Sequence, residues 1–359
     1  MLRYLLFVVL SATLIVSGIS AADDTQDLLD DIVSDYIEDD NALVVYLATP
    51  EGVWTVTAGF ARDDEPTTVE DRFRIGSVSK TLVAVAALML VEDGIFALDD
   101  PASDWLSDEI LQNVANAESA TIRQLLNMRS GIDDYLDTDA FLDAIEDDPQ
   151  REWTAEDVLV YAYGLPALFA PDADFNYSNT NYILLQIILE EASAMGLHEL
   201  IRERILEPLE MVDTYTQISE FLPGGFVDAY DADGFENLSE INDGAGLGDG
   251  GLISNVIDLH IFYEALLQER TLLSAAMMDE LLDFRPVDAS SGYSLGLDEW
   301  QTEFGVLWGH GGGVLGFASF SAYLPDDDAI IVILSANEDF ETSELMLDII
   351  DEILFFYQD

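Results

Sequence analysis

The sequence contains a single lysine, Lys80, among its 359 residues. It stands three residues after a serine, in the segment Ser77-Val78-Ser79-Lys80. On a helix this spacing brings a hydroxyl and an amine to one face, where the amine can activate the serine as a nucleophile. Residues 82–91 are all apolar, which predicts a buried helix that ends near Asp93-Gly94. The fold therefore has to bury this amine and supply it with partners.

Burial has consequences for both Ser77 and Lys80. In the first helical turn, free backbone N–H groups and the positive end of the helix dipole favour the negative charge that develops when Ser77 reacts. Desolvation lowers the pKa of Lys80, so that the amine can accept a proton, whereas nearby carboxylates raise that pKa. The alternative is a chance Ser-x-x-Lys with a solvated lysine, which the apolar helix disfavours.

A second motif, Tyr177-Ser178-Asn179, precedes a helical pattern that starts at Tyr182. A phenol beside an ammonium has a lowered pKa and can relay a proton, which predicts a catalytic role for Tyr177. The carboxamide of Asn179 can bind both an amine and a substrate amide. Taken alone, such a loop is more often a helix N-cap.

A third motif, Gly309-His310-Gly311-Gly312-Gly313, follows a short strand pattern at residues 306–309. Glycines let a substrate lie against a strand edge, and the Gly313 N–H could complete an oxyanion hole with the Ser77 N–H. Taken alone, a glycine run after a strand is usually a turn or a bulge.

Strand patterns occur near both ends of the chain, with helical patterns between them. Residues 43–49 and 53–60 read as a hairpin, and residues 316–324 and 329–334 as later strands. We predict an α/β (α+β) fold in which an antiparallel sheet, built from N- and C-terminal strands and flanked by helices, carries an inserted, mostly helical region. The sheet region is expected at residues 23–75 and about 285–359, and the helical region at about 76–284.

The N-terminus has the features of a signal peptide. Arg3 is followed by an apolar stretch over residues 5–16 and by small residues at Ser20, Ala21 and Ala22. The apolar stretch is shorter than the ~20 residues that a membrane span needs. We therefore expect residues 1–22 to be cleaved, leaving a secreted or periplasmic protein with no stable membrane anchor.

Composition excludes several classes of function. The formal net charge is −60, which makes nucleic acid and anionic membrane surfaces poor partners. The 50% hydrophobic share excludes a disordered acidic tail. Three histidines and no cysteine give no support for a zinc site, and we expect no metal and no cofactor.

One partial metal motif is discounted. Asp231, Asp233, Gly234 and Glu240 match four positions of a calcium-binding loop, but Ala229 stands at the first ligand position. Partial matches of this kind are expected in a chain with 72 acidic residues.

Together and in this order, the three motifs resemble those of the serine beta-lactamase and penicillin-binding superfamily. The similarity is to the branch of class C beta-lactamases, D-alanyl-D-alanine carboxypeptidases and related esterases, and it covers nearly the whole mature chain. It implies a catalytic set of Ser77, Lys80 and Tyr177. It also implies a substrate-binding set of Asn179, His310, Gly311, Gly312 and Gly313. Which of Lys80 and Tyr177 removes the serine proton stays open at this point.

Two departures from the family pattern bear on function. Asn127-Met128-Arg129-Ser130-Gly131 stands where relatives carry Asn-His-Thr-Ser-Gly, and His310 replaces the lysine of class C beta-lactamases. The second departure favours the carboxypeptidase or esterase side over a dedicated beta-lactamase.

The resemblance implies a serine hydrolase that works through a Ser77 acyl-enzyme. The expected substrate is a small molecule or peptide: a cell-wall D-peptide, an ester or a beta-lactam. The large negative charge tilts this expectation towards neutral esters or amides. The alternative from another class is a catalytically silent binding or scaffold protein of the same fold.

The acidic composition generates a prediction about salt. Because carboxylates without lysine partners repel one another, we expect both stability and activity to rise with ionic strength as that repulsion is screened. Thermal unfolding and turnover measured from low to high salt would check this. A flat profile for both would contradict it.

Overall fold

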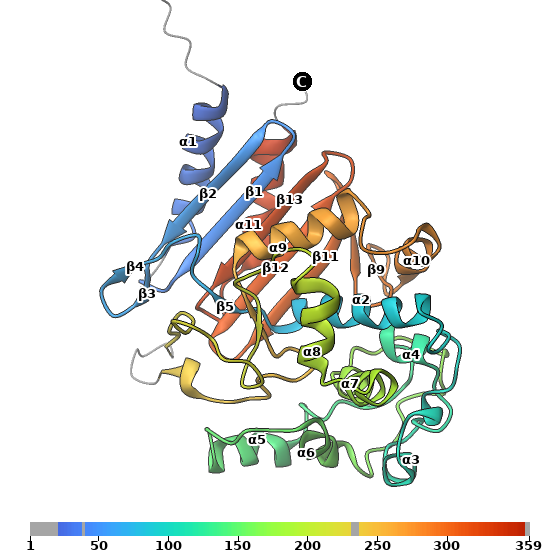
Figure 1. Ribbon diagram of the computed structural model, residues 1–359. Helices are drawn as coiled ribbons and strands as arrows, with labels where there is room; N and C mark the ends of the chain where they lie inside the picture. Colours follow the sequence, from blue (N-terminus) through green and yellow to red (C-terminus); the bar gives the residue numbers. More distant parts are fainter. Residues whose placement is uncertain (1–20, 38–39, 231–236, 356–359) are drawn as a thin grey trace, which may run out of the picture.

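An eight-stranded antiparallel sheet is the centre of the fold (Figure 1). The computed structural model describes residues 21–37, 40–230 and 237–355. The strand order in the sheet is β2-β1-β13-β12-β11-β10-β9-β8. The strands are β1 (Leu43–Thr49), β2 (Gly52–Ala58), β8 (Arg285–Pro286), β9 (Ser291–Tyr293), β10 (Asp298–Thr302), β11 (Gly305–Val314), β12 (Phe317–Leu324) and β13 (Ala329–Ser335). Strands from both ends of the chain therefore meet in one sheet, and the predicted mixed fold is confirmed.

Both faces of this sheet are covered, which explains why its strands alternate poorly between apolar and polar residues. In β1, Val44 and Tyr46 belong to the core on one face, and Val45 and Leu47 belong to the core on the other. The second face is covered by α1 (Ala21–Ser34) and α11 (Thr342–Ile349), with a π-helical turn η7 (Ile350–Phe355). Helix α9 (Val256–Tyr263) packs on the first face against β1, β12 and β13 (Figure 1).

Helix α2 (Ser79–Glu92) is the buried helix that the apolar run predicts. Residues 79–90 are all buried, so the helix has no solvent-exposed face over most of its length. It ends at Asp93, and Gly94 follows with a φ of +72°, which glycine adopts without strain. A 3₁₀ turn, η1 (Gly76–Val78), precedes α2 and contacts β11 and β12.

The rest of the middle of the chain is a set of helices around α2, and two small sheets of two and three strands accompany the main sheet. Helix α7 packs against α2, α4 and α6, as the lower part of Figure 1 shows. The helices are α3 (Asp108–Asn113), α4 (Ile122–Leu126), α5 (Asp139–Asp147), α6 (Ala155–Leu159), α7 (Thr180–Ser193), α8 (Leu197–Ile201) and α10 (Ala275–Leu281). Single turns are η2 (Ala102–Asp104), η3 (Val160–Ala162), η4 (Arg202–Leu206), η5 (Leu238–Glu240) and η6 (Glu264–Gln268). The short strands are β3 (Phe60–Arg62), β4 (Glu65–Pro66), β5 (Phe73–Arg74), β6 (Tyr215–Thr216) and β7 (Leu252–Ser254).

Two elements differ from the sequence prediction. The strand predicted at residues 306–309 continues to Val314, so the glycine run lies inside β11 and pairs with β12 instead of forming a turn. The spacing of Leu28, Leu29, Ile32 and Val33 predicts an amphipathic helix over residues 23–40, but this helix ends at Ser34. The sequence pattern ends the strand at Gly309 because the glycines that follow lack the side chains by which a strand is recognised.

Some predictions fall outside the described residues. Of the predicted signal peptide, the described part contains residues 21–22, which begin α1. Asp231, Asp233 and Gly234 of the discounted calcium motif also lie outside the described residues. Within the described part of the chain, no helix is long and apolar enough to cross a membrane. The domain boundaries proposed from the sequence remain a prediction.

Candidate active site

Ser77 lies where the helical region meets the sheet. Strand β5 leads directly into the 3₁₀ turn that carries Ser77, and Ser319 Oγ on β12 donates a 2.8 Å hydrogen bond to Ile75 O just before it. Gly76 has a φ of +47°, and a Cβ there would stand only 3.0 Å from the Gly313 nitrogen. The backbone of β11 therefore approaches the serine as closely as glycine allows.

Lys80 is completely buried on α2 and has three hydrogen-bond partners. Its Nζ lies 3.0 Å from Ser77 Oγ and 2.7 Å from Asn179 Oδ1, and it donates to Asp249 O. The expected meeting of Ser77, Lys80 and Asn179 is therefore present in the structure. The amine has a partner for each of its three donor positions.

Asp134 determines which way the Asn179 amide faces. Asp134 Oδ2 accepts hydrogen bonds from Asn179 N at 3.0 Å and from Asn179 Nδ2 at 2.8 Å. Because a carboxylate only accepts, Nδ2 has to face Asp134 and Oδ1 has to face Lys80. Two partners of Lys80, Asn179 Oδ1 and Asp249 O, can then only accept. When the amine is neutral, its two N–H groups donate hydrogen bonds to these two oxygens, and its lone pair can accept a hydrogen bond from the Ser77 hydroxyl.

Burial lowers the pKa of Lys80 to about 8. Desolvation is the largest cause, and the carboxylates of Asp249, Asp134 and Asp298 oppose it. These are the two competing effects that the sequence suggested. A pKa near 8 leaves a substantial neutral fraction of the amine at mildly alkaline pH, which an ordinary lysine lacks.

Tyr177 lies beside Lys80, but its pKa is shifted in the direction opposite to the one predicted from the sequence. Lys80 Nζ is 5.0 Å from the centre of the Tyr177 ring. The Tyr177 hydroxyl is buried and has no hydrogen-bond partner among the described residues. Burial raises its pKa well above 10, although the nearby Ser77 hydroxyl opposes this. The expected lowering of the Tyr177 pKa is wrong, because desolvation of the phenolate outweighs the neighbouring amine.

His310 is held inside the protein by its neighbours on the sheet. Its side chain is 3% exposed, with Nδ1 2.5 Å from Gly311 O and Nε2 3.3 Å from the Tyr293 hydroxyl. Burial, with a further contribution from Lys80, lowers the pKa of His310 to about 3. The ring is therefore neutral, with the proton on Nδ1 where the carbonyl accepts it. Its ring centre is 6.1 Å from that of Tyr177, so it packs beside the phenol, and its contact with substrate remains a prediction.

Three residues that complete the site were not predicted from the sequence. Asp134 positions Asn179, Asp249 bonds Lys80 through its carbonyl, and Tyr135 donates a 2.8 Å hydrogen bond to Asp249 Oδ2. Burial raises the pKa of Asp249 to about 6, and Lys80 opposes the rise. The available signal was weak: Asp249 precedes Gly250-Gly251 in a stretch that reads as loop, and the chain has 72 acidic residues.

A small cavity of about 110 Å³ opens at the nucleophile. Ser77, Asn179, Asp249 and Gly313 line it, together with Tyr135. One predicted residue from each of the three motifs therefore lines the cavity, whereas the other predicted residues do not: Lys80, Tyr177, His310, Gly311 and Gly312. A carbonyl group can reach both the serine and the strand edge from there.

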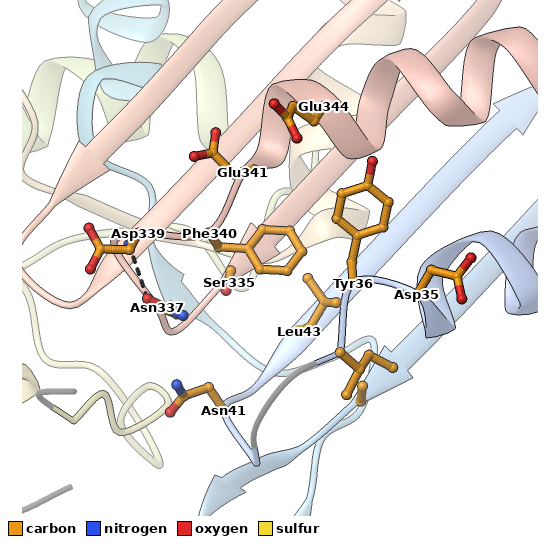
Figure 2. Close-up of a pocket in the computed structure, with 12 residues that line it drawn as sticks. Asp35, Tyr36, Asn41, Leu43, Ser335, Asn337, Asp339, Phe340, Glu341 and Glu344 are labelled. Carbon is orange, nitrogen blue, oxygen red and sulfur yellow. Dashed lines mark hydrogen bonds between the residues drawn. The ribbon is translucent and has the colours of Figure 1, made fainter. Parts of the chain in front are cut away.

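A separate pocket of about 310 Å³ lies between the end of α1, β1 and the start of α11 (Figure 2). Figure 2 shows Tyr36 and Phe340 near the carboxylates of Glu341 and Glu344. None of the predicted site residues lines this pocket. This pocket is therefore separate from the cavity at Ser77.

Comparisons with known proteins agree with this geometry. A family profile described as Beta-lactamase matches residues 29–353. The chain belongs to this family. A penicillin-binding protein of Bacillus subtilis strain 168 is 29% identical over 325 residues, which cover 83% of this chain and 68% of that protein.

Solved structures of Beta-lactamase family relatives superpose over most of the chain. A D-stereospecific amidohydrolase from Streptomyces sp. has a TM-score of 0.79 and 28% identity, covering 90% of this chain and 96% of that one. A D-amino acid amidase from Ochrobactrum anthropi SV3 has a TM-score of 0.74 and 25% identity, covering 92% of this chain and 99% of that one. The chain is thus a beta-lactamase-fold hydrolase related to penicillin-binding proteins and D-amino acid amidases.

The close approach of β11 to Ser77 generates a prediction for Gly312. A Cβ there would collide with Ile75 O and Ser319 Oγ and would lie 3.1 Å from the Ser77 nitrogen. Gly312→Ala should therefore displace the strand from the nucleophile and lower kcat/KM by about a hundredfold or more, as small misplacements in active sites do.

Gly311→Ala is the steric comparison, because the nearest atom to a Cβ there is Phe320 Cδ2 at 3.9 Å. It should lower kcat/KM far less than Gly312→Ala does. Steady-state kinetics, with thermal unfolding to verify folding, would measure both variants. Equal losses in the two would contradict the proposed steric cause.

Proposed function

We propose that the protein is a serine hydrolase that cleaves amide or ester bonds through an acyl-enzyme on Ser77. The observation that carries this proposal is the environment of Lys80: of its three hydrogen-bond partners in the described part of the chain, Ser77 alone can donate a proton. The cost of burying an amine is expected to be offset by a specific use for it.

The proposed reaction begins with attack of Ser77 Oγ on the substrate carbonyl carbon, while its proton moves to Lys80 Nζ. The N–H groups of Ser77 and Gly313 stabilise the oxyanion. Tyr177, which is protonated at neutral pH, gives its proton to the leaving group as the C–N or C–O bond breaks, and it regains one from Lys80. Water then attacks the acyl carbonyl carbon and gives a proton to Lys80 Nζ; the bond between that carbon and Ser77 Oγ breaks, and Oγ takes the proton from Lys80, which restores the serine hydroxyl and releases the acid.

The pKa directions assign the two proton-transfer roles. A base has to be unprotonated near the working pH, which a Lys80 pKa of about 8 permits. Burial keeps the Tyr177 phenol protonated, so Tyr177 suits the role of acid. We therefore assign to Lys80 the role of the base that removes the Ser77 proton during acylation, and to Tyr177 the role of the acid that protonates the leaving group.

The proposed substrate class is a small amide, ester or D-peptide. The solved relatives include a D-stereospecific amidohydrolase and a D-amino acid amidase, which supports amide cleavage. His310 in place of a lysine favours carboxypeptidase-like or esterase activity over beta-lactamase activity, and the net charge of −60 favours neutral amides and esters as substrates. The signal-peptide pattern supports a secreted or periplasmic location.

Covalent labelling of Ser77 tests the proposal. A fluorophosphonate probe should add one adduct by intact mass, and the adduct should disappear in Ser77→Ala. Lys80→Met, which keeps the volume of the stem, should slow labelling at least about a thousandfold because the base is lost. Turnover of D-phenylalaninamide, a D-Ala-D-Ala peptide, a cephalosporin and a short-chain ester would then rank the substrate classes.

The alternative, a catalytically silent scaffold protein, predicts neither Ser77 labelling nor turnover. A folded wild-type protein that forms no Ser77 adduct at any salt concentration, and turns over none of these substrates, would favour that alternative.

A further inference from the structure

The cavity at Ser77 continues into a larger apolar groove. Leu136, Asp243, Gly313 and Val314 line both spaces, so the two are contiguous. The groove has a volume of about 840 Å³. Its remaining apolar lining comes from α5, the segment after it, η5 and the turn between β11 and β12: Leu142, Ile145, Pro149, Leu238, Ile241 and Leu315. An apolar hollow of this size next to a nucleophile is suited to part of a substrate.

Strand β11 indicates which half of the substrate reaches the groove. His310 packs beside Tyr177, the proposed donor to the leaving group, whereas Gly313 lies against Gly76. These two strand positions are about 10 Å apart at about 3.3 Å per residue. The leaving group therefore lies toward His310, and the acyl half extends the other way, past Gly313 to Val314.

Asp243 stands at the junction of the cavity and the groove with one oxygen unpaired. Its Oδ2 accepts a 3.1 Å hydrogen bond from Leu315 N. Its Oδ1 is buried and has no hydrogen-bond partner among the described residues. The side chain as a whole is 18% exposed and lines both spaces, so a cationic group of a bound ligand can approach the carboxylate from the cavity.

The neighbouring arginine does not fill this role. Arg74 Nη1 is 4.0 Å from Asp243 Oδ1, which is beyond a hydrogen bond. The guanidinium donates instead to Gln217 Oε1 at 3.1 Å, Ser239 O at 3.0 Å and Ile241 O at 2.8 Å. Arg74 thus offsets part of the Asp243 charge across 4.0 Å without a hydrogen bond to Oδ1.

We propose that the acyl half of the substrate carries a protonated amine that pairs with Asp243 and an apolar side chain that occupies the groove. The two features lie next to each other, as they do on the α-carbon of an amino acid with a large apolar side chain. Glu146 and Glu338 also line the groove, and their charges disfavour an acyl half with a free carboxylate. This inference rests on the acyl-enzyme function proposed above.

Methyl esters that differ in one feature test the inference at pH 7. The set is phenylalanine methyl ester and alanine methyl ester, each as D and L forms, and methyl 3-phenylpropionate, which lacks only the amine. For the faster phenylalanine enantiomer, kcat/KM should exceed that of methyl 3-phenylpropionate by at least about tenfold, because the amine-free ester offers no ammonium to the Asp243 carboxylate. It should exceed that of the matching alanine ester by at least about tenfold, because the phenyl group fills the groove.

Variants separate the two contacts. Asp243→Asn keeps an acceptor for Leu315 N and should bring the ratio of phenylalanine to phenylpropionate ester toward one. Leu142→Ser, at a side chain that is 51% exposed, should lower the ratio of phenylalanine to alanine ester without threatening the fold. Asp143→Asn is the matched control: it removes a charge from an exposed neighbour on α5 that does not line the groove, and both ratios should stay at wild-type values.

The outcomes distinguish this inference from the proposed function. Equal rates for phenylalanine and phenylpropionate esters, or an unchanged ratio in Asp243→Asn, would overturn the amine contact. Equal rates for phenylalanine and alanine esters would overturn the groove assignment. In these cases turnover and Ser77 labelling persist, so the acyl-enzyme stands. The absence of all turnover and of any Ser77 adduct would overturn both proposals.

Discussion

A buried amine with two partners that can only accept is the interaction on which the site depends. Asn179 Oδ1 and Asp249 O each require a donor from Lys80, so the third position of the amine is directed at Ser77. This arrangement needs α2 to be covered on all sides, and the sheet and the short helices together provide that cover. It also needs the Asn179 amide to be fixed, which Asp134 does. The layers of the fold and the chemistry of the site are thus linked through one side chain.

The electrostatics of the site differ from those of the surface. The chain as a whole carries a net charge of −60, yet the carboxylates nearest Lys80 are buried and hydrogen-bonded. Asp249 and Asp134 raise the pKa of the amine and so limit the effect of its burial. Surface repulsion is screened by salt, whereas these short buried interactions are screened much less. Changes in salt should therefore act mainly on stability and on substrate approach.

The motifs could be predicted from the sequence because each has a strong local signal. The apolar residues 82–91 fix α2, and the single lysine draws attention to Ser77. The strand pattern ends at Gly309 because glycine has no side chain to continue it, although pairing with β12 places all of these glycines inside the sheet. The pKa direction of Tyr177 was wrong because the depth of its hydroxyl is a tertiary property. Asp134, Asp249 and Asp243 could not be distinguished among so many acidic residues, since only burial and hydrogen bonding set them apart.

The pKa of Lys80 is the quantity that tests this account most directly, and the single lysine makes it measurable. Protein labelled with ¹³C at lysine Cε and expressed without a lysine-containing tag should give one side-chain signal, which can be followed by NMR through a pH titration. We predict a pKa of about 8 and a lower value in Asp249→Asn, because that substitution removes a negative charge that favours the ammonium. A pKa at or above the 10.5 of an ordinary lysine would contradict the account, since the amine could not then serve as the base for Ser77.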